Sequence, residues 1–125
     1  MKHKLLIKFD NGSSIINTII VTDEKKSHAI KLNEKIPIGE GFLFVFEEAI
    51  SPLMFWNKGF SNDIELLYID SNLAIRKIDT LKSNSTDVSI CGIQVKYVIE
   101  VPIGTCKEYN LKVGSRAVDF ERLKV

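Results

Sequence analysis

The sequence predicts an α+β domain that is mostly β, with short strands in a small antiparallel, barrel-like arrangement and one or two short helices. Three observations carry this prediction. Short apolar runs recur along the chain between turn-forming residues, which is typical of strands. Only two stretches carry helix signals. The 125 residues, 45% of them hydrophobic, suffice for one core. Because no repeat or shift in composition marks a boundary, we expect residues 1–125 to form a single domain.

The first two predicted strands form a hairpin. Leu5–Phe9 and Ile15–Val21 are apolar runs on either side of Asp10, Asn11 and Gly12. Asn-Gly is the pair favoured in tight hairpin turns, where both central residues take a positive φ. We therefore expect Asn11 and Gly12 to occupy the centre of such a turn.

A short helix and a buried strand are expected next. Asp23–Lys31 is largely polar and suits a helix that begins near Asp23. A segment with proline and glycine follows and ends it. Phe42–Phe46 is apolar at every position, so we expect a strand that is covered on both faces.

The middle of the chain predicts three further strands and one loop. Leu53–Trp56 and Ile64–Ile69 have strand character, and the turn-forming residues 70–72 lead into a strand over Leu73–Ile78. Thr80–Asp87 is rich in Ser, Thr, Asn and Asp, which makes it the most loop-like stretch of the sequence.

Ile93–Val101 shows the clearest alternation. Its odd-numbered residues are apolar, whereas Gln94, Lys96 and Glu100 share the other face. This pattern predicts a strand with a polar face that is mostly solvated.

The last predicted elements are a helix and a strand. Thr105 and Glu108 have the spacing of a capping box, which predicts a short helix after Gly104. Ala117–Phe120 is expected to form a final strand.

Charge and composition exclude several classes of function. With 17 basic and 16 acidic residues the net charge is +1, so we expect no nucleic-acid partner. No apolar run has the length of a membrane span, and the N-terminal apolar stretch is too short for a signal peptide. Cys91 and Cys106 match no metal-ligand spacing and are interpreted as buried thiols, with a disulfide as the alternative. We expect a cytoplasmic protein without a metal or cofactor.

Three segments in series resemble the domain of unknown function 192 (DUF192) family of small bacterial and archaeal proteins. They are Gly41–Phe46, Phe55–Lys58 continuing to Ile64–Asp70, and Val98–Val101 with Gly104 and Gly114. The resemblance covers about residues 24–120. It implies a compact barrel-like β fold and no assigned reaction.

The chain departs from the family pattern at several positions. The family arginine is missing from residues 29–33, Gly59 and Phe60 replace an Asn-Thr pair, and Glu65 replaces an aspartate. Ser115 follows Gly114 where the family has an acid. A polar site shared by the family would therefore be altered in this chain.

Trp56, Lys58 and Phe60 are the first group of candidate binding residues. An indole can stack on a ligand and an ammonium can pair with an anionic group, and Gly59 lets the loop over residues 57–63 adopt unusual geometry. The alternative is that Trp56 closes the core beside a solvated Lys58.

Glu65 and Glu100 are the other two candidates. Glu65 begins a strand of apolar residues, so it lies either at an exposed strand end or is buried with a partner such as Lys58 or Arg76. Two carboxylates across a cleft suit glycoside hydrolysis or cation binding, provided that Glu100 approaches Glu65.

These observations favour a non-catalytic β module that binds a small ligand or a partner protein near Trp56 and Lys58. A hydrolase acting on a sugar or another polar polymer through Glu65 and Glu100 is the first alternative. A structural domain that oligomerises through exposed edge strands is the second.

Overall fold

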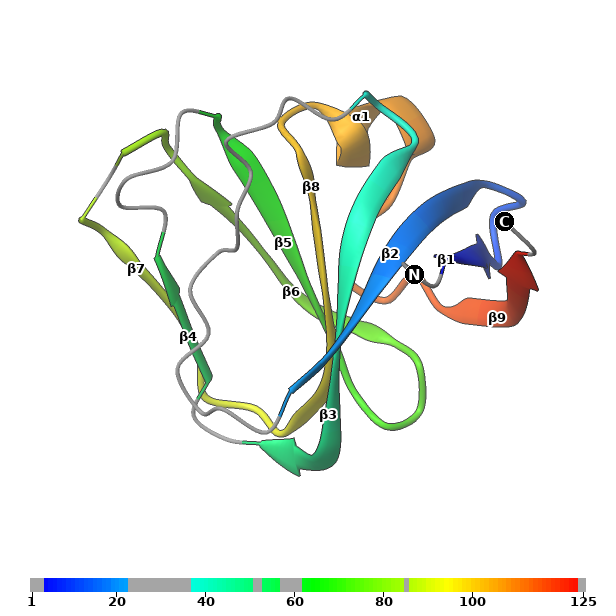
Figure 1. The fold of residues 1–125 in the computed structure, drawn as a ribbon, viewed down its shortest axis with the longest axis horizontal. Coiled ribbons are helices and arrows are strands. Elements are labelled where there is room, and N and C mark those ends of the chain that lie inside the picture. Colours follow the sequence, from blue (N-terminus) through cyan, green and yellow to red (C-terminus); the bar gives the residue numbers. More distant parts are fainter. Residues whose placement is uncertain (1–3, 23–36, 51–52, 57–61, 85, 124–125) are drawn as a thin grey trace.

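The computed structural model describes residues 4–22, 37–50, 53–56, 62–84 and 86–123 (Figure 1). Within these residues the chain is mostly β, with one short helix, so the predicted class is confirmed. The elements are, in order, β1 (Lys4–Phe9), β2 (Ser14–Thr22), β3 (Glu40–Ile50), β4 (Leu53–Trp56), β5 (Ile64–Ile69), β6 (Ile75–Leu81), β7 (Val88–Cys91), β8 (Val95–Pro102), α1 (Thr105–Tyr109) and β9 (Ala117–Leu123).

The strands form one large sheet and one small one. The large sheet has the order β6-β5-β8-β3-β2-β1-β9, and β4 pairs with β7 in a separate two-stranded sheet. β2 and β3 run parallel, whereas the other paired strands are antiparallel. The large sheet is therefore mixed, and among the described strands it is not closed into a barrel. The barrel-like arrangement predicted from the sequence thus differs from the structure in one parallel pairing, between β2 and β3, and in this open edge.

Seven of the predicted strands coincide with β1–β5, β8 and β9 to within a few residues. The strand predicted over Leu73–Ile78 begins later, at Ile75, and extends to Leu81. β7 was not predicted. It directly follows Thr80–Asp87, the stretch predicted to be a loop. The helix predicted over Asp23–Lys31 lies outside the described residues.

The large sheet is covered on both faces. On one face lies the small sheet, and their shared core contains Phe44, Phe46, Phe55, Ile64, Leu66, Tyr68, Leu81, Cys91, Val95 and Val98. The core on the other face contains Ile7, Phe9, Ile15, Leu43, Leu67, Ile69, Ile75, Ile99, Val101, Cys106, Leu111 and Ala117. We call these the small-sheet face and the helix face of the large sheet.

The helix face is partly enclosed because the two ends of the large sheet approach each other. Backbone hydrogen bonds link Gly114, Ser115 and Ala117, which lie before and at the start of β9, to residues 73 and 75, before and at the start of β6. Ala74 and Arg116 form an isolated antiparallel bridge at the same place. The contact is confined to these few residues.

The first hairpin turn differs from the predicted one. Gly12 has a φ of 88°, but Asn11 is not among the residues with positive φ. The bond from Phe9 N to Ser13 O closes a turn with one residue more than the predicted turn. The Asn11 side chain donates to the carbonyls of Tyr109 (2.8 Å) and Asn110 (3.0 Å), so this turn holds the end of α1.

α1 is present as predicted, but its start is different. The N-cap is Gly104, at a φ of 93°, and no side chain of the predicted capping box caps the helix. Thr105 Oγ1 instead donates to the Pro102 carbonyl at 2.7 Å. The capping-box interpretation is therefore wrong, because the glycine can take the left-handed conformation that starts the helix one residue earlier.

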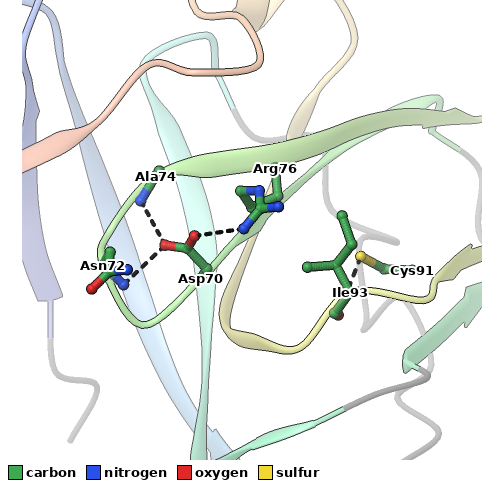
Figure 2. A network of polar contacts seen from close by, with 6 residues as sticks. All are labelled: Asp70, Asn72, Ala74, Arg76, Cys91 and Ile93. Atoms are coloured by element: carbon green, nitrogen blue, oxygen red, sulfur yellow. Dashed lines mark hydrogen bonds and ion pairs between the residues drawn. The ribbon is translucent and has the colours of Figure 1, made fainter.

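The turn before β6 is organised by Asp70 (Figure 2). Asp70 Oδ1 accepts from the backbone N–H groups of Asn72 (2.9 Å) and Ala74 (3.1 Å), and Oδ2 accepts from Arg76 at 3.1 Å. Burial alone raises the pKa of Asp70, but these hydrogen bonds and the Arg76 charge outweigh it and hold the pKa below its usual value.

The lowered pKa of Asp70 makes the stability of this turn dependent on pH. Its contribution is present above the unfolded-state pKa of about 3.9 and is lost as the pH falls through the lower folded-state pKa. We expect urea unfolding at a series of pH values to show a steeper loss of stability in acid for the wild type than for Asp70→Asn. Equal acid dependence of the two proteins would contradict this role.

Gly41 sets the spacing of β3 and β8. A Cβ atom at this position would lie 2.8 Å from the Glu100 carbonyl oxygen and 2.8 Å from Val101 Cγ1. We therefore expect Gly41→Ala to lower the free energy of unfolding by about 1–3 kcal/mol, the usual range for overpacking. The matched control is Gly92→Ala, whose Cβ meets nothing within 4 Å. Urea unfolding checks both, and similar stabilities of the two variants would refute the packing argument.

Candidate functional site

The outward face of the small sheet presents exposed apolar side chains. In β7, Val88 and Ile90 are 43% and 48% exposed, whereas Ser89 and Cys91 between and after them are buried. This alternation shows that β7 is a half-buried strand whose outer face is apolar. An exposed apolar row of this kind is a feature of interaction surfaces.

β4 continues this face by its pairing with β7. Phe55 pairs with Ser89, and both are buried against the large sheet. The position of Trp56 pairs with Val88, and that of Met54 pairs with Ile90. The backbone register thus aligns these two β4 positions with the two exposed residues of β7.

Aromatic and polar contacts fix the small sheet on the large one. The Phe55 ring lies edge-on to Phe44 (centroids 5.3 Å apart) and to Tyr68 (6.1 Å). The Tyr68 hydroxyl is 2.6 Å from Ser89 Oγ, which donates to Asp79. Because burial raises the pKa of Tyr68, the phenol stays protonated and remains able to donate.

Lys77 completes the attachment at the edge of β7. Its Nζ atom donates to the Ile90 carbonyl and lies 3.4 Å from Asp79 Oδ2. The backbone of β7 is thus held at the point where Ile90 projects outward. The outward face of β7 therefore belongs to a strand whose position is fixed.

Of the first group of predicted binding residues, the structure describes only the backbone of Trp56. The backbone of Trp56 ends β4, and its pairing with Val88 locates it on the small sheet. Lys58 and Phe60 lie outside the described residues. Their use in binding stays a prediction, as does that of the Trp56 side chain.

Glu65 lies on the helix face of the large sheet and interacts with α1. Its Oε1 accepts a hydrogen bond from the backbone N–H of Cys106 at 3.0 Å. That N–H belongs to the first turn of α1, where the helix itself supplies no acceptor. Arg76, which was expected as a partner of Glu65, instead pairs with Asp70.

The thiol of Cys106 has a raised pKa. Burial is the larger cause and the Glu65 carboxylate the next, and together they raise this pKa to about 12.

Glu100 is completely buried, with 0% exposure, so the prediction of a solvated face on β8 is wrong. It pairs with Phe42 of β3 and Leu66 of β5, on the small-sheet face. The strand is covered on both sides because the small sheet lies over the face that the sequence pattern marked as polar. A carboxyl group without exposed surface offers no contact to a polymer.

The register also separates the two carboxylates. Glu65 pairs with Val101, whereas Glu100 pairs with Leu66, the neighbour of Glu65 in β5. Successive residues of a strand point to opposite faces, so Glu65 and Glu100 lie on opposite sides of the sheet. They cannot flank one glycosidic bond, and the hydrolase arrangement that depends on the pair is excluded.

The cysteines and the acidic residues form no metal site in the part of the chain that the structure describes. Cys91 and Cys106 are both free and buried, as the sequence favoured. They belong to the cores on the two opposite faces of the large sheet.

Sequence reasoning missed Val88, Ile90 and the Tyr68–Ser89 contact. The signal was the alternation of residues 88–91, two apolar residues separated by a serine and followed by a cysteine. This alternation was overlooked because it covers only four residues and follows a polar loop.

The comparisons with known proteins agree with the motifs. The model of the DUF192 family, described as "Uncharacterized ACR", matches residues 7–118. This chain belongs to the DUF192 family. The match begins earlier than the region over which the motifs resemble the family and ends close to it.

Solved structures show the same fold. A "putative transcription regulator" from Sinorhizobium meliloti is similar over 98% of this chain and 94% of its own, with a TM-score of 0.75 and 23% identity. A protein of unknown function from Novosphingobium aromaticivorans is similar over 93% of this chain and 84% of its own, with a TM-score of 0.73 and 11% identity. No functionally curated protein matches the chain. The biochemical function of this DUF192 protein is thus unknown.

Among the described residues, the α-helical part is far too short to cross a bilayer.

We expect Glu65 to stabilise α1 in this DUF192 protein by accepting a hydrogen bond from a backbone N–H of its first turn. Glu65→Ala should lower the free energy of unfolding by about 0.5–2 kcal/mol, the range for loss of a capping acceptor. Glu65→Gln keeps an acceptor oxygen and should cost less, while loss of the charge lowers the pKa of Cys106. Urea unfolding and the pH dependence of thiol alkylation, in a Cys91→Ala background, measure the two effects. An unchanged alkylation profile in Glu65→Gln would contradict the contact.

Proposed function

We propose that this chain is a non-catalytic binding module that recognises a partner protein through the outward face of β4 and β7, with Trp56, Lys58 and Phe60 as part of the same surface. One observation carries the proposal: the burial of β7 alternates so that Val88 and Ile90 face outward on a strand whose other side is fixed in the core.

The register supports the inclusion of Trp56. Phe55 and Ser89 form the inward pair, and the backbone of Trp56 pairs with the exposed residue Val88. Tryptophan is enriched among the residues that dominate protein interfaces. Exposed apolar side chains on the outer face of a sheet favour a protein partner over the small ligand that the sequence left open.

Lys58 and Phe60 follow β4 within four residues in the sequence, and the proposal includes them for their residue types. An ammonium group beside apolar side chains gives a partner both an apolar contact and an orienting charge. Nucleic acid is not the proposed partner, because the chain has a net charge of only +1. The function named for the S. meliloti protein is accordingly not transferred to this chain.

We also propose that the protein is located in the cytoplasm.

The exposure of Trp56 is directly measurable because it is the only tryptophan. We expect acrylamide to quench its fluorescence in the native protein nearly as strongly as in urea. Trp56→Ala should change the free energy of unfolding by no more than about 0.5 kcal/mol, as for a surface residue. Phe55→Ala, the buried neighbour, should cost about 3–5 kcal/mol. A shielded tryptophan, or unfolding of Trp56→Ala, would assign Trp56 to the core and end its role in this surface.

Recognition itself is tested with a displayed library of random peptides. Selection on the wild-type protein, with Ile90→Asp as the counter-selection target, should enrich a common sequence. Binding of that peptide should be lost in Ile90→Asp and in Trp56→Ala, and kept in Val113→Asp, which changes an exposed apolar residue outside the small sheet. Peptides that bind wild type and Ile90→Asp equally would refute the proposed surface.

A further inference from the structure

The large sheet ends in an edge strand, β9. It pairs with β1 on one side, and beyond its first residue, Ala117, whose N–H donates to the Leu73 carbonyl, no described strand pairs with its other side. The five residues from Val118 to Arg122 are all exposed, so β9 is open on both of its faces. An exposed edge strand carries unpaired N–H and C=O groups that can pair with another strand.

The protections of this edge are incomplete. β9 contains neither proline nor lysine and is seven residues long, although it carries three charged residues and its register against β1 shifts between Ala117 and Asp119. Two large apolar side chains, Val118 and Phe120, are 58% and 36% exposed on it. Phe120 also contacts Tyr97 of β8, with ring centroids 6.1 Å apart, so this part of the edge is anchored to the rest of the sheet.

The charges on β9 disfavour a second copy of this chain as the occupant. In a two-fold antiparallel pair, the register centred on Phe120 sets Asp119 against Glu121 on both sides. The registers centred on Asp119 or Glu121 set each of these acids against itself. Every register that pairs five or more residues of β9 with its own copy thus opposes like charges, which is unfavourable.

The same charges favour a basic strand. On the inner side, Lys8 of β1 pairs with Asp119, and its Nζ atom lies 3.8 Å from Glu121. One lysine therefore faces two carboxylates on this face of the edge. A neighbouring strand with basic residues opposite Asp119 and Glu121 would continue the alternation of charge across the sheet. Its intervening residue would lie beside Phe120, on the face that carries apolar side chains.

We propose that β9 accepts an additional strand from a partner protein, an extended segment in which basic and apolar residues alternate. Main-chain hydrogen bonds along β9 supply the attachment, and Asp119 and Glu121 select the charge. In Figure 1, β9 and the small sheet lie at opposite sides of the molecule. The proposal is therefore independent of the surface formed by β4 and β7.

The test uses a short blocked peptide of alternating lysine and valine, with an alternating glutamate and valine peptide as its counterpart. Fluorescence anisotropy gives the affinities, and amide chemical shifts locate the contact. We expect the lysine peptide to bind and to shift the amides of β9, and the glutamate peptide not to bind. Asp119→Lys should weaken binding about tenfold, because an attractive cross-strand pair becomes a repulsive one.

Glu108→Lys is the matched control, since it makes the same change of charge at an exposed residue of α1. It should leave the affinity unchanged. Circular dichroism confirms the fold of each variant, and Glu121→Lys repeats the test at the second acid. Equal binding of the two peptides, no effect of Asp119→Lys, or shifts outside β9 would overturn the proposal. A wild-type dimer in sedimentation that Phe120→Asp dissociates would overturn it too, because the occupant would then be a second copy.

Discussion

The burial of β8 on both faces is the constraint on which the rest of the structure depends. β8 lies between β5 and β3 near the middle of the large sheet, and Val98, Ile99 and Val101 have no exposed surface. A shift of one residue in its pairing would exchange its two faces. The register thus decides at once which residues meet the small sheet and which meet α1.

This constraint explains the placement of the polar groups. β5 is held in register with β8, so Glu65 must lie on the helix face and is available to the first turn of α1. The same register sends Glu100 to the other face, under the small sheet. The close approach of β3 to β8 excludes a side chain at position 41, which accounts for the glycine at the start of the first family motif. Local packing of the sheet, without any shared reaction, is sufficient to explain this position.

The sequence predicted those features that depend on local pattern. Apolar runs located most strands, since burial of a strand requires apolar residues along it. Features that depend on distant partners could not be obtained in this way. Glu100 resembled a solvated residue because nothing near it in sequence indicates that the small sheet covers it. The start of α1 depends on the left-handed conformation of Gly104, and the parallel pairing of β2 and β3 depends on which strands become neighbours in the sheet, which no local pattern specifies.

The candidate binding surface was predictable only in part for the same reason. Trp56 and Lys58 were noticed because of their residue types, but whether a tryptophan packs or binds depends on the strand opposite it. That strand, β7, was hidden by a serine at a buried position, and the serine is buried because Tyr68 and Asp79 supply its hydrogen bonds. The polar contact that concealed β7 in the sequence is therefore the one that fixes it in the structure. For the proposed recognition role, a strand held in this way is already ordered, so little conformational entropy would remain to be lost on binding. This is the physical reason for favouring recognition by the small sheet over chemistry in a sheet whose two candidate carboxylates lie on opposite sides.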